Sequence, residues 1–278
     1  MKITQTAICE WFAISRQAHN QMKLRRLVRT AEEMLILKEV RRIRQSHPRM
    51  GTRKLLVVLA DTFEEHGVKM GRDRFFDLLR RHDQLIQQKR KATRTTFPGG
   101  LRSENILAST TISAPNQAFV VDITYLATEQ GFLYLALVTD LYSRKIVGWD
   151  LSSSLSLEGA LQALKRAVTH AGGQVSGLIH HSDHGSQYTS RPYLDFIENA
   201  GIRPSMGEVG NAYDNAVAER VNGILKLEYL LDQRFPDFFS ASQATQQAIH
   251  YYNSERPHTS LGLQVPEHVY AQTLGLEA

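Results

Sequence analysis

The spacing of apolar residues along the chain changes near residue 112. Before it, apolar residues recur every three or four positions, as in "AEEMLILKEVRRIRQ", "TRKLLVVLADTFEEHG" and "GRDRFFDLLRRHDQLI", which predicts amphipathic helices. After it, short apolar runs such as "AFVVDITYL" and "GLIHHSD" predict strands that alternate with helical segments. We therefore expect an all-α region followed by an α/β domain in which helices pack on a mixed sheet.

The first helical segment, "TAICEWFAISRQAHNQM", has the outline of a helix-turn-helix. Ser15 is a candidate N-cap for a second short helix, which would present Arg16 to DNA. A separate long helix follows at about residues 31–45, and we expect Pro48 and Gly51 to end it. Many helical hairpins have this pattern, so a purely structural hairpin is the alternative.

A second helix-turn-helix is predicted on either side of Gly67, where two amphipathic helices meet. Arg72 and Arg74 would lie near the start of its recognition helix, and Arg53 and Lys54 would add basic charge. The alternative is a helical bundle with solvated arginines. The basic stretch "QQKRKATRTTFPGG" then reads as a linker that follows a phosphate backbone through three residues: Lys89, Arg90 and Lys91.

The α/β region begins with three predicted strands, the last two joined by a tight turn near residues 142–144. Gly172 and Gly173 end the helix that follows, and Pro192 and Gly201 mark the beginning and end of the next helix. A strand "IRPSM" and two further helices, in "DNAVAERVNGILKLEYLL" and "ASQATQQAIHYYNSE", complete the expected order.

Charge separates the two halves in the same way. Residues 1–100 contain 22 Lys and Arg against 10 Asp and Glu, whereas the remainder has 11 against 18, within a net charge of +5. A basic region attached to an acidic one favours a polyanionic partner, and we expect nucleic acid rather than a merely solvated basic surface.

A single cysteine, Cys9, excludes an internal disulfide and a zinc site built from several cysteines, so we interpret it as a small core residue. No apolar run reaches the length of a membrane-spanning helix, and the first residues lack the pattern of a signal peptide. We expect a soluble protein of the reducing cytoplasm that does not enter membranes.

Candidate chemistry lies in three acidic residues. Asp122 interrupts the apolar run "VVDITYL", and Asp183 ends the run "GLIHHSD", where ligands of α/β sheets gather. Glu219 lies on a predicted helix face that also carries Asn215, Asn222, Gly223 and Lys226. Taken singly, these residues could pair with an arginine, cap a loop or face solvent. Together, their oxygens would suit Mg²⁺ and a two-metal phosphoryl transfer.

The spacing of these residues is more specific than their chemistry. Sixty residues separate Asp122 from Asp183 and thirty-five separate Asp183 from Glu219, with Lys226 seven residues further on. This pattern resembles the DDE recombinases, which include retroviral integrases and many transposases. The stretches "DLYSRKIVGWDLS", "HHSDHGSQYTS", "GNAYDNAVAERVNGILKLE" and "YYNSERPHTSLGLQVPE" resemble the downstream-frame product of insertion-sequence transposases of the third ("IS three") family, over about residues 30–270.

The resemblance implies an RNase H-like catalytic core with a DDE triad of Asp122, Asp183 and Glu219 that binds two Mg²⁺ or Mn²⁺ ions. It also implies cleavage at the element end, followed by attack of the freed 3′-hydroxyl on a phosphodiester. The expected partners are double-stranded DNA at the terminal inverted repeats and at the target, and a second copy of the chain. In bacteria, this activity would be cytoplasmic and associated with the nucleoid.

Roles for further residues follow from the same resemblance. Lys226 would contact phosphate near the cut, and Asn215 and Tyr213 would shape the site, although a solvated lysine and a core tyrosine are the alternatives. His181 and His184 would support the site or contact DNA rather than bind metal, because Mg²⁺ prefers oxygen, with a structural role as the alternative. Three more residues are assigned with reservations: Asp140 as a strand-end hydrogen bonder, and Arg256 and His258 as DNA contacts or parts of an anchoring turn.

The expected domains are a first helix-turn-helix-like segment at 1–30, a helical DNA-binding domain at 31–92, a basic linker at 93–111, and the catalytic core with a C-terminal helical segment at 112–278. Members of this family are usually made as a fusion with an upstream-frame product that adds a helix-turn-helix and a leucine zipper. This chain shows no sustained heptad repeat, so that product is a further candidate partner. Two alternatives remain open: a metal-dependent nuclease that cuts without joining, and a non-catalytic DNA-binding regulator.

Overall fold

The computed structural model describes residues 4–87, 104–207 and 215–275. The chain forms two compact units, one made of Met1–Ser46 and Met50–Ile86 and the other of His47–Arg49 and Gln87–Ala278. Among the described residues, no helix combines the length and the apolar character needed to cross a membrane. Tyr213, Lys89, Arg90 and Lys91 lie outside the described residues.

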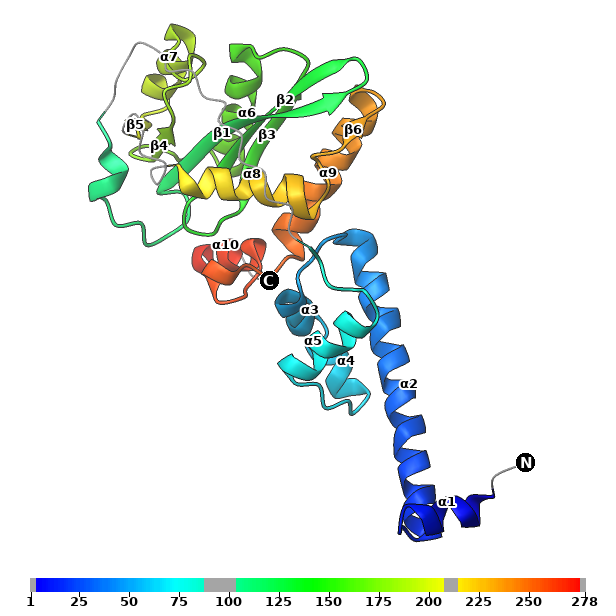
Figure 1. The fold of residues 1–278 in the computed structure, drawn as a ribbon. Helices are drawn as coiled ribbons and strands as arrows, with labels where there is room; N and C mark the ends of the chain where they lie inside the picture. The colour runs from blue at the N-terminus through cyan, green and yellow to red at the C-terminus, as the bar shows by residue number, and fades with distance from the viewer. Residues whose placement is uncertain (1–3, 88–103, 208–214, 276–278) are drawn as a thin grey trace. The chain divides into compact units, whose positions relative to one another are not determined.

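The first unit is entirely helical, as expected (Figure 1). Its helices are α1 (Gln5–Trp11), α2 (Arg16–Ser46), α3 (Thr52–Val58), α4 (Ala60–Glu65) and α5 (Arg72–Arg81). The expectation of a short helix followed by a separate long helix was wrong, because α2 is continuous across both. No proline or glycine interrupts residues 16–46, so nothing in the local sequence stops the helix. Ser15 does cap it, since its Oγ accepts a hydrogen bond of 3.1 Å from the amide of Ala18.

The core of this unit forms where the second half of α2 packs against α3, α4 and α5. Buried residues of α2 meet buried residues of the rest of the unit; they include Ile36, Val40, Leu55, Leu59, Phe63, Phe75 and Leu78. The single helix expected over residues 52–65 is divided at Leu59, which is fully buried and lies between α3 and α4. Gly67 has a positive φ of 63° and ends α4 as predicted.

The second unit contains a mixed sheet with the order β3-β2-β1-β4-β5. Its strands are β1 (Ala118–Thr128), β2 (Gly131–Asp140), β3 (Ile146–Ser152), β4 (Ile179–Ser182), β5 (Arg203–Met206) and the short β6 (Arg234–Phe235). β1, β2 and β3 are antiparallel neighbours, whereas β4 and β6 pair parallel to β1 at its opposite ends. The edge of β1 between β4 and β6 is therefore open, and this opening positions the candidate site.

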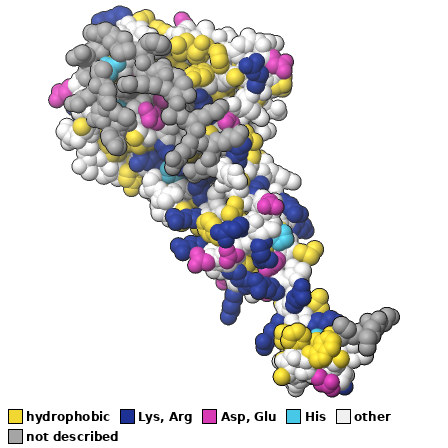
Figure 2. Space-filling view, viewed as in Figure 1, with side chains coloured by type: hydrophobic (Ala, Val, Ile, Leu, Met, Phe, Trp, Pro, Cys, Tyr) yellow, Lys and Arg dark blue, Asp and Glu magenta, His cyan; other side chains and the backbone are white. Residues whose placement is uncertain are grey.

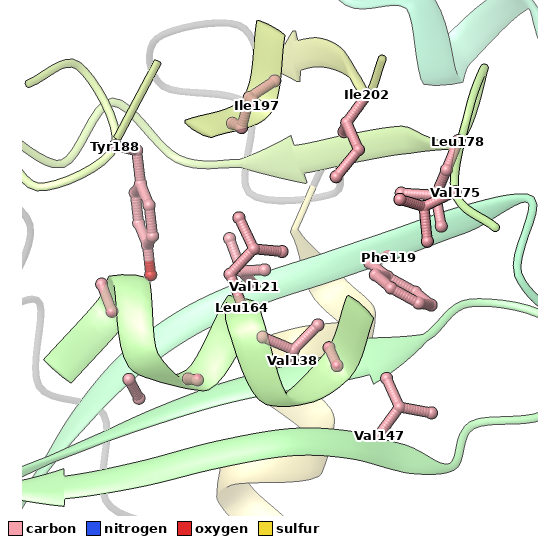
Figure 3. Close-up of a cluster of buried hydrophobic side chains, with 14 of the residues drawn as sticks. Phe119, Val121, Val138, Val147, Leu164, Val175, Leu178, Tyr188, Ile197 and Ile202 are labelled. Atoms are coloured by element: carbon pink, nitrogen blue, oxygen red, sulfur yellow. The ribbon is translucent and has the colours of Figure 1, made fainter. Parts of the chain in front are cut away.

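Helices cover both faces of this sheet, as Figure 1 shows. They are α6 (Leu157–His170), α7 (Arg191–Asn199), α8 (Ala216–Glu228), α9 (Phe238–Ser254) and α10 (Pro266–Leu274). Phe119 and Val121 of β1 and Val138 of β2 pack with Leu164 of α6, in the core drawn in Figure 3. On the other face, Leu126 packs with side chains of α8 and α9. This alternation confirms the expected α/β class, whereas β6 and α10 were not predicted from the sequence.

Candidate active site

The pairing of β1 with β4 brings two of the predicted acidic residues to the same level of the sheet. The last paired residues of these parallel strands are Val120 and His181, and Asp122 and Asp183 each lie two residues further on. Because parallel strands advance together, the two carboxylates reach the same level of the sheet. Asp122 remains within β1, whereas Asp183 lies in the loop after β4.

Asp122 is held by two hydrogen bonds but also lies close to other negative charge. Its Oδ1 accepts from the amide of Ile123 at 2.9 Å, and its Oδ2 accepts from Nδ2 of Asn222 at 2.6 Å. Burial, followed by the charge of Asp183 and to a smaller extent that of Glu219, raises the pKa of Asp122 to about 7 despite these donors. The shift indicates that the three predicted acids interact electrostatically.

Asp183 is half-buried, and its Oδ1 accepts from the amide of Gly185 at 3.0 Å. Burial raises its pKa, while that hydrogen bond and the neighbouring His184 oppose the rise. His181 Nδ1 lies 3.0 Å from Oγ of Ser205, and His184 Nε2 lies 2.7 Å from the carbonyl oxygen of Gly207. Both imidazoles are buried, which favours the structural alternative over direct contact with DNA.

Helix α8 supplies the third acid and the amide that contacts Asp122. Glu219 is exposed in the first turn of α8, and Asn222 follows it by three residues on the same helix face. Since Asn222 donates to Asp122, this face of α8 looks toward β1. The sequence analysis placed Asn222 on the same helix face as Glu219 but assigned it no role in the site.

The donor set consists of oxygens, as a hard divalent cation requires. Besides the carboxylates, Oδ1 of Asn222 and Oδ1 of Asn215 are buried and have no hydrogen-bond partner among the described residues. The Asn215 amide donates to the carbonyl oxygen of Val121 at 3.4 Å, beside Asp122. Within the described ranges, however, no three Asp, Glu, His or Cys side chains are close enough to hold an ion together. The oxygen donors therefore match a divalent cation in chemical type, but the described side chains are not gathered closely enough to enclose one.

Lys226 lies seven residues after Glu219 and is half-buried beside the open edge of β1. Its Nζ lies 4.5 Å from the ring centre of Tyr125. Burial lowers the pKa of Lys226, while the charge of Asp122 opposes that change. Tyr125 in turn packs edge-on against Phe132, with 5.4 Å between ring centres, and both rings are exposed. The sequence analysis did not single out either ring.

Asp140 has the hydrogen-bonding role expected for it. Its Oδ1 accepts from the amide and the hydroxyl of Ser143, at 2.7 and 2.6 Å, and its Oδ2 accepts from the amide of Asn116 at 2.8 Å. The residue is fully buried at the end of β2 and closes the turn to β3. Burial raises its pKa and the three donors oppose that rise.

Arg256 and His258 occupy the interior of the second unit. Arg256 is 2% exposed, and its Nε and Nη2 donate to the two carboxylate oxygens of Glu228, each at 2.8 Å. His258 is also buried, with Nδ1 2.9 Å from Oγ of Ser260. A buried and bidentate guanidinium does not reach a DNA phosphate, so the expected contact of Arg256 is replaced by the alternative, an anchoring turn.

The basic residues predicted on the helical unit lie at or near its surface. Arg16, Arg53 and Arg72 are exposed, and Arg74 and Lys54 are half-buried. Arg74 donates to Glu32 at 3.0 Å and Arg72 to Asp73 at 2.9 Å, so part of this charge is already paired. Lys and Arg side chains nevertheless gather over α2 to α5 on the face that Figure 2 shows.

Known proteins match this chain over most of its length. Two family models, each described as an integrase core domain, match residues 112–212 and 200–266. An insertion element IS600 uncharacterized 31 kDa protein of Shigella sonnei is 38% identical over 76% of this chain and 78% of its own length. Transposase InsF for insertion sequence IS3A of Escherichia coli is 38% identical, over 52% of each chain.

The extent of these matches varies. The chain spans about half the length of several other insertion-sequence transposases that it matches, such as 44% of a putative IS986/IS6110 transposase of Mycobacterium tuberculosis. Among solved structures, the HTLV-2 integrase catalytic core domain in complex with magnesium is 19% identical. It has a TM-score of 0.46 and covers 56% of this chain and 97% of its own.

Proposed function

Because this chain belongs to the insertion-sequence transposases with an integrase core domain, enzymes of the polynucleotidyl transferase type, we propose that it acts on the ends of its own element. The proposed reaction is metal-dependent cleavage that frees a 3′-end, followed by transfer of that end to a phosphodiester of the target. Asp122, Asp183 and Glu219 are the proposed catalytic triad.

One observation carries this proposal: the parallel pairing of β1 with β4 brings Asp122 and Asp183 to the same level of the sheet, and Asn222, one turn after Glu219, donates to Asp122. Burial and the neighbouring acids raise the pKa of Asp122 to about 7, in agreement with this arrangement. The ionised form of a carboxylate that is removed from water and lies near other acids is unfavourable, and a bound cation would offset the repulsion between their charges. Clusters of this kind are typical of functional sites rather than of structural ion pairs.

The three carboxylates would hold one or two Mg²⁺ or Mn²⁺ ions, and the unpartnered Oδ1 of Asn222 is a further oxygen within the site. When bound, such ions activate the attacking oxygen and neutralise charge that develops on the transferred phosphoryl group. Asn222 and the amide of Ile123 fix the orientation of the Asp122 carboxylate, and the amide of Gly185 fixes that of Asp183. The protein thereby positions its acidic oxygens before DNA arrives.

Lys226 is the proposed contact for a phosphate next to the cut. Its Nζ lies over the Tyr125 ring and is close enough to Asp122 to be affected by that charge, so its ammonium group is proposed to bind a phosphate whose neighbour occupies the acidic site. Asn215, beside Val121, would support the same strand of DNA. The helical unit would bind the duplex through Arg16, Arg53, Lys54, Arg72 and Arg74, and the basic residues Lys89, Arg90 and Lys91 would add to this charge.

A strand-joining assay tests the proposal. The full chain is incubated with labelled duplex that carries the terminal repeat of its element, with Mg²⁺ or Mn²⁺, beside Asp183→Asn. Asp195→Asn is the matched control, because Asp195 is an acid of α7 that pairs with Arg191 on the surface. We expect metal-dependent joined products from the wild type and the control, and none from Asp183→Asn.

The other outcomes identify the competing functions. Cut strands without joined products would favour a nuclease, and metal-independent binding without either product would favour a regulator of the element. Because strand transfer needs two ends in one complex, we also expect at least a dimer on DNA. If the chain alone binds but does not react, the same assay with the upstream-frame fusion separates a regulator from an incomplete transposase.

A further inference from the structure

The first half of α2 has an apolar surface with nothing packed on it among the described residues. Leu24, Leu27, Val28 and Met34 are 62%, 60%, 51% and 67% exposed, and Ala31 is exposed as well. Exposed hydrophobic side chains are also visible around α1 and the beginning of α2 in Figure 2. Contiguous exposed apolar surface on a long helix indicates a partner.

These residues form one stripe along the helix. Leu24, Val28, Ala31 and Leu35 follow one another at intervals of four, three and four residues, which is the spacing of a coiled-coil seam. Leu27 and Met34 border the stripe on one side. The residues of α2 that enter the core of the unit, such as Ile36, Val40 and Ile43, lie about 90–150° from the middle of the stripe around the helix. The stripe therefore lies outside the core of its own unit, and Arg74 of α5 lines a hollow beside it together with Leu24 and Val28.

The charge pattern along this stretch indicates which partner helix fits the stripe and whether the two helices run parallel or antiparallel. Residues 24–29 contain three arginines and no acid, whereas residues 30–35 contain two glutamates and no base. Two copies aligned in parallel would set each arginine beside the arginines of the other copy. Two antiparallel copies would set the arginines of one against the glutamates of the other, twice over, because the pair has two-fold symmetry.

We propose that α2 pairs antiparallel with α2 of a second copy of this chain, centred between Val28 and Ala31. Val28 then faces Ala31 of the second copy, and Leu24 faces Leu35 of the second copy. Leu27 and Met34 extend the apolar contact along one flank. The pairing does not rest on the proposed catalytic function.

The other flank supplies the ion pairs. Arg25 follows Leu24 and Glu32 follows Ala31, so in the antiparallel pair Arg25 of each copy lies next to Glu32 of the other. Glu32 already accepts a hydrogen bond from Arg74 through Oε2, and its second oxygen can accept from the second copy. A hollow of about 510 Å³, lined in part by Leu24, Val28 and Glu32, gives the incoming side chains room along this flank.

The surface of the stripe is smaller than the contact area of a stable dimer, which is about 800 Å² on each partner. We therefore expect a weak dimer that forms at micromolar concentrations. The test is sedimentation equilibrium of the full chain without DNA, with Leu24→Lys beside Met22→Lys. Met22 is 58% exposed and lies about 160° from Leu24 around the helix, so it adds the same charge outside the stripe.

Leu24→Lys should raise the dimer dissociation constant at least about tenfold, and Met22→Lys should change it less than about twofold. A wild type that stays monomeric at high micromolar concentration would overturn the proposal. So would a dimer that Leu24→Lys leaves unchanged, because another surface would then hold it together. Circular dichroism checks that both variants keep their helix content.

Charge reversal tests the direction of the pair. Arg25→Glu alone should weaken the dimer about fivefold, and combining it with Glu32→Arg should return the constant to within about twofold of wild type. Only an antiparallel pair brings these two positions together. If the double variant is as weak as Arg25→Glu alone, or weaker, the antiparallel arrangement is wrong.

Discussion

Two carboxylates on neighbouring strands of the same sheet, one buried and one half-buried, have different surroundings. Asp140, at the end of β2, accepts three hydrogen bonds from Ser143 and Asn116 and closes a turn. Asp122, on β1, accepts two, and its charge is opposed by Asp183 and Glu219. Burial raises the pKa of both groups, but the oxygens of Asp140 meet three donors, whereas Asp122 meets two donors and the opposing charge of Asp183.

The difference separates a structural acid from a functional one. An acid whose oxygens all meet donors stabilises the fold around it, and its removal leaves those donors unsatisfied. An acid placed among other acids destabilises the fold, and its retention points to a ligand that compensates. Sequence alone marks both residues as strand acids, so the surroundings decide which is which.

The largest expected effect is on strand joining. Asp122→Asn should reduce the rate of joining at least about a thousandfold, because the metal-assisted step loses several kcal/mol of stabilisation. Asp140→Asn should keep the rate per folded molecule within about threefold of wild type. Joined products are quantified against the folded fraction measured by circular dichroism. Equal losses in the two variants would remove the distinction between the two acids.

Asp140→Asn should instead lower the free energy of unfolding by about 3 kcal/mol. The amide nitrogen of the new side chain would meet a donor where Asp140 now accepts from Ser143 or Asn116, so at least one of these groups becomes unsatisfied. Urea denaturation measures the change, with the exposed Asp195→Asn as a control that should lose less than about 0.5 kcal/mol. A loss as small as that of the control would show that the turn does not depend on the charge.

Asp122→Asn should stabilise the metal-free protein at alkaline pH. The pKa of Asp122 in the folded state, about 7, lies above its ordinary value of 3.8. Protonated Asp122 therefore contributes fully to the free energy of unfolding below pH 3.8, and this contribution is lost as the pH rises to about 7. The asparagine variant carries no charge and does not suffer this loss. Full expression of that difference would be roughly 4 kcal/mol, and with solvent screening we expect about 2 kcal/mol at pH 8.

Denaturation curves recorded in a chelator between pH 4 and pH 8 measure the gap, which is the difference in the free energy of unfolding between Asp122→Asn and the wild type. It should shrink as the pH falls, and Mg²⁺ should narrow it at pH 8 by stabilising only the wild type. A gap that does not change with pH would mean that Asp122 is not the titrating group.

The smallest effect is expected from Lys226→Met. It removes one phosphate contact and should weaken DNA binding about tenfold at low salt, with a slope of log affinity against log salt that is lower by about one. Lys165→Met is the matched control, because Lys165 of α6 also lies over an aromatic ring, that of Phe196 of α7. Fluorescence anisotropy over a salt series compares them. The same loss in both variants would argue against a specific role for Lys226.

The site was predictable in part because its chemistry is local in sequence. Asp122 interrupts an apolar run and Asp183 ends one, and the family resemblance rests on the sequence motifs around them. Both could therefore be predicted as site residues from the sequence. Asn222 was not assigned a role, because its value depends on which face of α8 meets β1. Arg256 was expected near DNA, yet its surroundings include Glu228, 28 residues away along the chain, which no local pattern reveals.

The sequence by itself determined the family, the order of most helices and strands, and the division into a basic helical region and an α/β domain. Periodicity and turn residues act over a few neighbours, so they are legible in one dimension. The tertiary structure alone decided that α2 continues without a break, that β6 and α10 complete the domain, and that Arg256 is buried. It also decided that Asp122 stands among acids while Asp140 stands among donors, because burial and charge depend on residues brought together from distant parts of the chain.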